Sequence, residues 1–172
     1  IVFPRNLQWA IGFKEITAPT NVRTMIAAFV PFAAFGNKLP LLLPDLSARP
    51  ASVMSEEQAA QWQAAIDRQI ETYKSFAPLL LGNMNSFAFD YIARQKVQGT
   101  TLNLYIVEQL PVVPAPEFTS KIGRCAAGAM IRDHVLRLTY TAHDMEPFAR
   151  DQGYDGPPFA WDERERRHLR AR

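Results

Sequence analysis

The side chains with the most distinct chemistry in this 172-residue chain lie within residues 85–113. Arg and Lys neutralise phosphates, Thr hydroxyls bind a sugar-phosphate chain, and Asn or Gln can read adenine edges. The stretch therefore permits nucleic-acid binding, and the alternative is a solvated helix end where the helix dipole favours cations. The cations, amides and hydroxyls concerned are Asn85, Ser86, Arg94, Lys96, Thr100, Thr101, Asn103 and Gln109.

The common catalytic and phosphate-binding motifs are absent from the sequence. No two glycines have the G-x-G spacing, and the pair at P-loop spacing, Gly123 and Gly128, lacks the Lys and hydroxyl residue that must follow. No acidic residue has a Lys two positions later, as a common nuclease motif requires, and no Ser lies on a glycine-flanked elbow. We therefore expect no catalytic residues in this chain.

Metal sites and disulfides are also not expected. Cys125 is the single cysteine, and His134, His143 and His168 have no partners at ligand spacing, so we interpret His134 and His143 as structural or surface residues. One unpaired cysteine fits a reducing compartment, and a cytoplasmic location is expected. The longest apolar stretch, 25–35, is interrupted by Pro31 and is shorter than the about 18 residues that a membrane span requires, so no membrane partner is expected.

The segment 155–159, Asp-Gly-Pro-Pro-Phe, looks like a base-methylating site. Such enzymes hold the target nitrogen with an Asn or Asp followed directly by Pro-Pro and an aromatic ring. Here Gly156 separates Asp155 from the prolines, and no glycine-rich cofactor strand precedes it. We therefore interpret the segment as a plain turn.

The elements that would position these residues begin with a strand-rich part, 1–44. Alternation of side chains predicts a strand at 8–16 with only one face buried. An apolar, partly β-branched run that Pro31 closes predicts a strand at 24–30, and a short strand bounded by prolines is expected at 39–43. A capping box of Ser55 and Gln58 predicts a helix over 55–77 that ends before Pro78. A second helix capped at Asn85-Ser86 is expected to end at a left-handed Gly99, with a strand at 101–107 after it.

The C-terminal part, 117–172, is predicted to be helical. We expect helices at about 121–140, at about 144–151 ending at Gly153, and from a cap at Asp162 to the end, after an extended proline segment at 111–116. The whole chain is expected to be one α+β domain with a small twisted sheet packed against several helices. It has no initiator Met and no leader, and we expect it to be a piece of a longer protein.

Three ordered segments make the sequence similar to a known family. It resembles the C-terminal target-recognition region of large adenine-specific DNA methyltransferases of restriction-modification and phage-defence systems, type IIG restriction enzymes among them. More loosely, it is similar to the DNA-specificity subunits of type I restriction systems. The matching segments are 13–16 with 20–24 and 36–40, then 85–103 with 109–112, and finally 138–144 through 153–159.

The resemblance implies a parent enzyme that transfers a methyl group from S-adenosylmethionine to adenine N6, with its catalytic domain and cofactor upstream. The present chain would bind duplex DNA, choose its sequence and contact that catalytic domain, without cofactor or catalysis of its own. Whether the parent also cleaves DNA stays open. The 55–77 helix matches nothing in the family and is a possible insertion, and Gln98 stands where the family commonly has a second Gly.

Carried over by position, the resemblance implies Arg94, Lys96, Thr100 and Thr101 as contacts to the DNA backbone. Arg23 and Lys38 would form a second basic edge, with a solvated surface as the alternative for each; Asn103 would read a base or hold a turn. Positive charge is concentrated early, because the first fifty residues carry five basic and two acidic residues.

The alternative function is a protein-interaction or scaffold module of the same parent, in which the 55–77 helix docks on the methyltransferase core. A free-standing small enzyme is a third class, for which no acid/base pocket can be assembled.

Overall fold

The computed structural model describes residues 7–33, 35–50 and 53–171, and its centre is a three-stranded antiparallel sheet. The strand β1 pairs on one edge with β2 and on the other with β3, so that Ile11 lies opposite both Phe29 and Leu42. All three predicted strands are present but shorter than expected. Their bounds are Trp9–Phe13 for β1, Ala27–Pro31 for β2 and Leu41–Leu42 for β3.

Both faces of β1 are buried, whereas the alternating pattern predicted one exposed face. The prediction failed because β1 is the central strand and is covered on both sides. Trp9 packs against Phe29 and Phe148 with ring centroids 4.8 and 5.2 Å apart. At Gly12, an added Cβ would lie 3.2 Å from the side chain of Leu39, so this residue, two positions before β3, covers Gly12.

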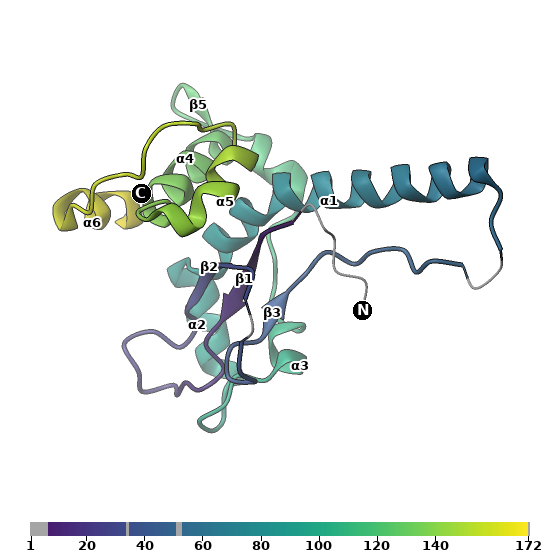
Figure 1. The fold of residues 1–172 in the computed structure, drawn as a ribbon. Helices are drawn as coiled ribbons and strands as arrows, with labels where there is room; N and C mark the ends of the chain where they lie inside the picture. Colours follow the sequence, from purple (N-terminus) through teal and green to yellow (C-terminus); the bar gives the residue numbers. More distant parts are fainter. Residues whose placement is uncertain (1–6, 34, 51–52, 172) are drawn as a thin grey trace.

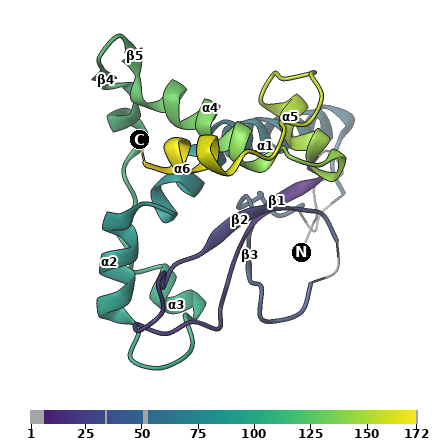
Figure 2. The same cartoon turned by 90° about the vertical axis from the view of Figure 1, so that its left-hand side faces the viewer.

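Four helices gather on one side of the sheet, and α2 and α3 lie at another (Figures 1 and 2). The architecture confirms the α+β class. The helices are α1 (Glu56–Met84), α2 (Phe87–Lys96), α3 (Leu104–Val107), α4 (Ala127–Thr139), α5 (Glu146–Asp151) and α6 (Glu163–Ala171), with 3-10 turns at Ala115–Thr119 (η1) and His143–Met145 (η2).

The long helix α1 begins as predicted but continues past Pro78. At its start, Ser55 accepts from the N–H of Gln58, and the side chain of Gln58 accepts from the N–H of Ser55, which confirms the capping box. The predicted end at residue 77 is wrong. Proline lacks the N–H that would bond to the carbonyl of Lys74, and the side-chain amide of Gln152 donates to that carbonyl at 3.1 Å instead.

The first part of α1 extends away from the sheet and the other helices as an arm (Figure 1). The segment that precedes α1 runs alongside this part of the helix. At Ser47, the carbonyl accepts from the indole N–H of Trp62, while the N–H and hydroxyl bond to the amide of Gln69. The helix predicted as a possible insertion therefore protrudes and is braced by its own preceding segment.

The segment 101–107 is not the predicted strand. Thr101 forms an isolated bridge with Ile16, and the chain then turns into the short helix α3. Leu102, Ile106 and Leu110 are buried, whereas Leu104 is 46% exposed. The apolar residues of this segment therefore follow the four-residue spacing of a helical turn, which the alternation at 102, 104 and 106 concealed.

The turn after α2 also differs from the prediction. Ser86 caps α2 as expected, since its hydroxyl accepts from the N–H of Phe89 at 3.1 Å. Gly99, however, does not have a positive φ, and the helix ends at an extended Val97. Because Val97 is itself buried against the core, packing rather than a left-handed residue ends this helix.

The C-terminal part is less helical than predicted at its start. Residues 121–126 form a hairpin of β4 (Lys121–Ile122) and β5 (Cys125–Ala126), turning at Gly123 with φ of 63°, before α4 begins. Helix α5 ends at Asp151, as predicted, and Gly153 after it has a left-handed φ of 77°. The cap of α6 is also confirmed, because the carboxylate of Asp162 accepts from the N–H of Glu165 at 2.7 Å.

Candidate functional site

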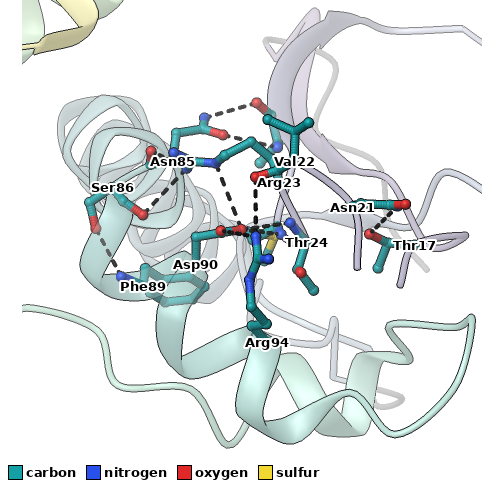
Figure 3. A network of polar contacts seen from close by, with 12 residues as sticks. Thr17, Asn21, Val22, Arg23, Thr24, Asn85, Ser86, Phe89, Asp90 and Arg94 are labelled. Atoms are coloured by element: carbon teal, nitrogen blue, oxygen red, sulfur yellow. Dashed lines mark hydrogen bonds and ion pairs between the residues drawn. The ribbon is translucent and has the colours of Figure 1, made fainter. Parts of the chain in front are cut away.

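Asp90 is the centre of a polar network between α2 and the loop that joins β1 to β2 (Figure 3). Its Oδ1 accepts from the backbone N–H groups of Thr24 and Met25, each at 2.7 Å. Arg94, one helical turn later, donates to its Oδ2 at 3.2 Å, and Arg23 lies 3.7 Å from Oδ1. Sequence reasoning missed Asp90, although the i,i+4 spacing of an acid and Arg94 was a usable signal.

The network holds Asp90 in its charged form. Burial opposes ionisation, but the hydrogen bonds from Met25, Arg94 and Thr24 and the charge of Arg23 outweigh it and lower the pKa of Asp90. Two cations and one buried carboxylate therefore form a paired cluster at this point. Its main structural effect is to hold the loop before β2 on α2.

Arg94 and Arg23 both donate into the protein. Arg94 bonds to the carbonyls of Pro19 at 2.8 Å and Val22 at 3.1 Å, besides its pair with Asp90. Arg23 donates to the carbonyls of Asn85 and Ser86, and its guanidinium lies 4.9 Å from the ring centroid of Phe87. These two predicted DNA contacts are thus engaged in packing the loop against α2.

Asn85 joins the same network to the edge of the sheet. Its Oδ1 accepts from the N–H of Ala27 at 3.2 Å, and its Nδ2 donates to the carbonyl of Ala27 at 2.9 Å. The amide thereby satisfies both backbone groups of the first β2 residue in the way a neighbouring strand would. Asn85 also ends α1, where the sequence predicted that it would help to cap α2.

The other predicted residues, except Lys38, meet at an open cavity of about 500 Å³ beyond the end of α2. Lys96, Thr100, Thr101 and Asn103 all line it, so four of the seven predicted contacts lie together. Neither Glu nor Asp occurs among the described residues that line it. The remaining lining residues, which sequence reasoning did not select as contacts, are Gln98, Gly99, Tyr105, Ile106 and Gln109.

The polar groups of this cavity are largely uncommitted. Lys96 is exposed and forms no ion pair within the described part of the chain. Asn103 precedes α3 at a position where an Asn side chain commonly bonds to the helix, yet it makes no such bond. An unpaired ammonium beside hydroxyls and amides, in a lining whose described residues include no acid, can accept a phosphate or another anion.

Lys38 lies near this region but is paired. Its ammonium is 3.1 Å from Oε2 of Glu15, a buried oxygen that no other described donor reaches. The backbone of Glu15 accepts from the N–H of Leu102 at 2.7 Å, which connects the strand-rich part to the cavity wall. Lys38 therefore neutralises an acid at the edge of the candidate site.

The segment 155–159 packs as a turn, as predicted. The ring of Tyr154 stacks on Phe159 at 4.8 Å, and its hydroxyl donates to the carbonyl of Pro157 at 3.1 Å. A Cβ on Gly156 would lie 2.5 Å from the Tyr154 ring, so this glycine permits the close approach. Asp155 is exposed.

The described ranges contain no group of three or more His, Cys, Asp or Glu side chains placed to hold a metal ion. Likewise, none of their helices is long and apolar enough to cross a membrane. Comparison with protein-family models, curated proteins and solved structures found no match to this chain.

Proposed function

We propose that this chain is a DNA target-recognition domain of an adenine-N6 DNA methyltransferase of the restriction-modification type. The observation that carries the proposal is the cavity at which Lys96, Thr100, Thr101 and Asn103 meet without an acidic neighbour. In this proposal Lys96 and the two hydroxyls bind phosphates, and the chain positions duplex DNA for a catalytic domain elsewhere in the parent. That catalytic domain would hold S-adenosylmethionine.

The distribution of charges also supports DNA binding at the end of the molecule that holds the cavity. Two acids of the adjoining loops, Asp90 and Glu15, are each paired with cations, so they repel phosphates little. The arm of α1 is acidic in its first turn, with Glu56 and Glu57 exposed. DNA is therefore expected to bind at the loops around the cavity and not along the arm.

The test is the salt dependence of duplex binding, measured by fluorescence anisotropy on the full chain with random-sequence DNA. Affinity is expected to fall steeply with salt, and Lys96→Ala should reduce the log–log slope by roughly one. Lys121→Ala is the matched control, because Lys121 is exposed and lies at the opposite end of the molecule, in β4 (Figure 2). Its slope should equal that of the wild type. A flat salt response of the wild type overturns the proposal.

The second candidate is a docking module of the same parent enzyme. The protruding part of α1 favours it, because an exposed helical arm braced by residues 45–50 offers a surface that the fold itself does not use (Figure 1). A flat salt response together with binding to the methyltransferase domain would support this function in place of DNA recognition. Substitution of the exposed Gln61 and Asp67 by Arg should then weaken that binding.

A further inference from the structure

We propose that the loop of residues 18–23, called here the reading loop, contacts DNA bases through Thr20, Asn21 and Val22. The inference rests on the proposed function and assigns base reading to a loop outside the lining of the cavity described above. It has three supports: the backbone of the loop is held in place, its central side chains point outward into solvent, and it adjoins the cavity assigned to phosphates.

The backbone of the reading loop is fixed by hydrogen bonds at both ends. A turn closes between the N–H of Asn21 and the carbonyl of Ala18 at 3.1 Å, and that carbonyl also accepts from the hydroxyl of Thr24 at 3.2 Å. Arg94 holds the carbonyls of Pro19 and Val22 from the side of α2.

Asp90 on α2 adds to this support. Its Oδ1 accepts hydrogen bonds from the N–H groups of Thr24 and Met25, the residues that follow the loop (Figure 3). A loop whose carbonyls at Ala18, Pro19 and Val22 are bonded within the protein needs little further ordering when it binds. The buried acid and its two arginines therefore act as positioning residues for an exposed loop.

The three central side chains are exposed and carry different chemistry. Thr20 offers a hydroxyl, Asn21 an amide, and Val22 an aliphatic group that is 95% exposed. The amide of Asn21 donates weakly to Thr17 at 3.3 Å, while no described donor reaches its Oδ1. Asn can pair with adenine, and an apolar group can contact the methyl of thymine, so this set suits readout of A·T pairs in the major groove.

The reading loop lies beside the phosphate-binding cavity. The N–H of Thr17, one residue before the loop, bonds to the carbonyl of Thr100 at 3.0 Å. Phosphate contacts fix register on a duplex, and neighbouring groups then read the bases. The loop itself contains no acidic residue. A duplex bound at Lys96 thus has the reading loop next to it.

With the full chain, preferred duplexes are first selected from a library of random-sequence DNA. The affinity is then measured for the selected site and for each of its single-base changes. Val22→Ser and Asn21→Ala should each reduce discrimination at one or two adjacent base pairs by about tenfold. Their salt slopes should stay at the wild-type value, because neither side chain contacts phosphate. Val53→Ser is the matched control, since Val53 is another fully exposed valine, at 101%, and lies before α1.

Arg94→Lys tests the positioning role separately. Lysine keeps the charge but cannot hold two loop carbonyls and a carboxylate with a planar fork. Discrimination should fall at the positions that Val22 and Asn21 affect, at a temperature where circular dichroism shows the variant to be folded. A purely structural Arg94 would lower the melting temperature and leave the base preference unchanged.

The outcomes separate this inference from the proposed function. Salt-dependent binding with no base preference, or with a preference that Val22→Ser and Asn21→Ala leave unchanged, overturns the reading loop and leaves DNA binding intact. Loss of salt-dependent binding in the wild type overturns the proposed function and the inference with it. A change of preference in Val53→Ser equal to that in Val22→Ser also overturns the inference.

Discussion

The side-chain amide of Gln152, just after α5, donates a hydrogen bond to the carbonyl oxygen of Lys74 in the middle of α1. That carbonyl has no helical partner because Pro78 occupies the position four residues later. The next carbonyl, of Ser75, accepts from Nε and Nη2 of Arg132 on α4. The side chain of Gln152 thus replaces the donor that Pro78 lacks, and Arg132 adds a second attachment between α1 and the later part of the chain.

We predict that Gln152→Ala lowers the free energy of unfolding by about 1–2 kcal/mol, because the carbonyl of Lys74 loses its donor. In a Pro78→Ala background the helix regains a backbone N–H at that position, and the same substitution should cost about 1 kcal/mol less. Urea denaturation of the two single variants and the double variant measures this coupling. Equal costs in both backgrounds would show that Gln152 does not replace the missing donor.

Asp90→Asn should destabilise the protein by about 3 kcal/mol at pH 7, because two arginines and two backbone N–H groups lose a buried carboxylate. The pKa of Asp90 is lowered in the folded state, so its contribution is fully present above the unfolded value near 4. It is lost as pH falls through the lower, folded value. Chemical denaturation between pH 7 and pH 2 should therefore show the gap between wild type and variant closing in acid.

The control for Asp90 is Asp67→Asn on the exposed side of α1. Asp67 accepts from Gln63 alone among the described residues, and its loss should change stability by less than about 0.5 kcal/mol. A gap between wild type and Asp90→Asn that stays constant into acid would contradict the assignment of the stabilisation to the ionised carboxylate.

Local capping signals were read correctly from the sequence because their partners are three residues away. Ser55, Ser86 and Asp162 each cap the helix predicted for them. The three N-terminal strands were also recognised, because short runs of strand-forming residues bounded by turn residues and prolines are local signals. Their pairing order, with β1 in the middle, could not be deduced, because it depends on contacts among three strands that the sequence separates.

The errors come from partners that are distant in sequence. Pro78 predicted a helix end, and only the position of Gln152 in the fold allows the helix to continue. For Arg94, which the resemblance implies as a DNA contact, the acceptors within the fold include the carbonyls of Pro19 and Val22, which are also distant in sequence. Neither partner can be identified by spacing. By contrast, Lys96 and Thr100 were selected together and do lie together, because a short turn joins them.

Tyr73 links α1 to the sheet and should give the protein an alkaline stability transition. Its hydroxyl donates to the carbonyl of Leu42 at 2.9 Å and accepts from the N–H of Ile11 at 3.3 Å. Burial raises the pKa of Tyr73 to about 12, although the hydrogen bond from the Ile11 N–H acts in the opposite direction. The raised value means that the neutral form is favoured in the folded state.

We predict that Tyr73→Phe costs about 1–2 kcal/mol at pH 7, through the unpaired groups of Leu42 and Ile11. The folded-state pKa near 12 lies above the unfolded value of 10.0, so the stabilisation is complete below pH 10 and disappears between pH 10 and 12. Over that window the wild type should lose about 2–3 kcal/mol more than Tyr73→Phe in denaturant unfolding. Tyr105→Phe, which removes an exposed hydroxyl, controls for the loss of a tyrosine. Parallel loss of stability in wild type and Tyr73→Phe would refute the link, because a tyrosine with equal folded and unfolded pKa values adds no pH dependence.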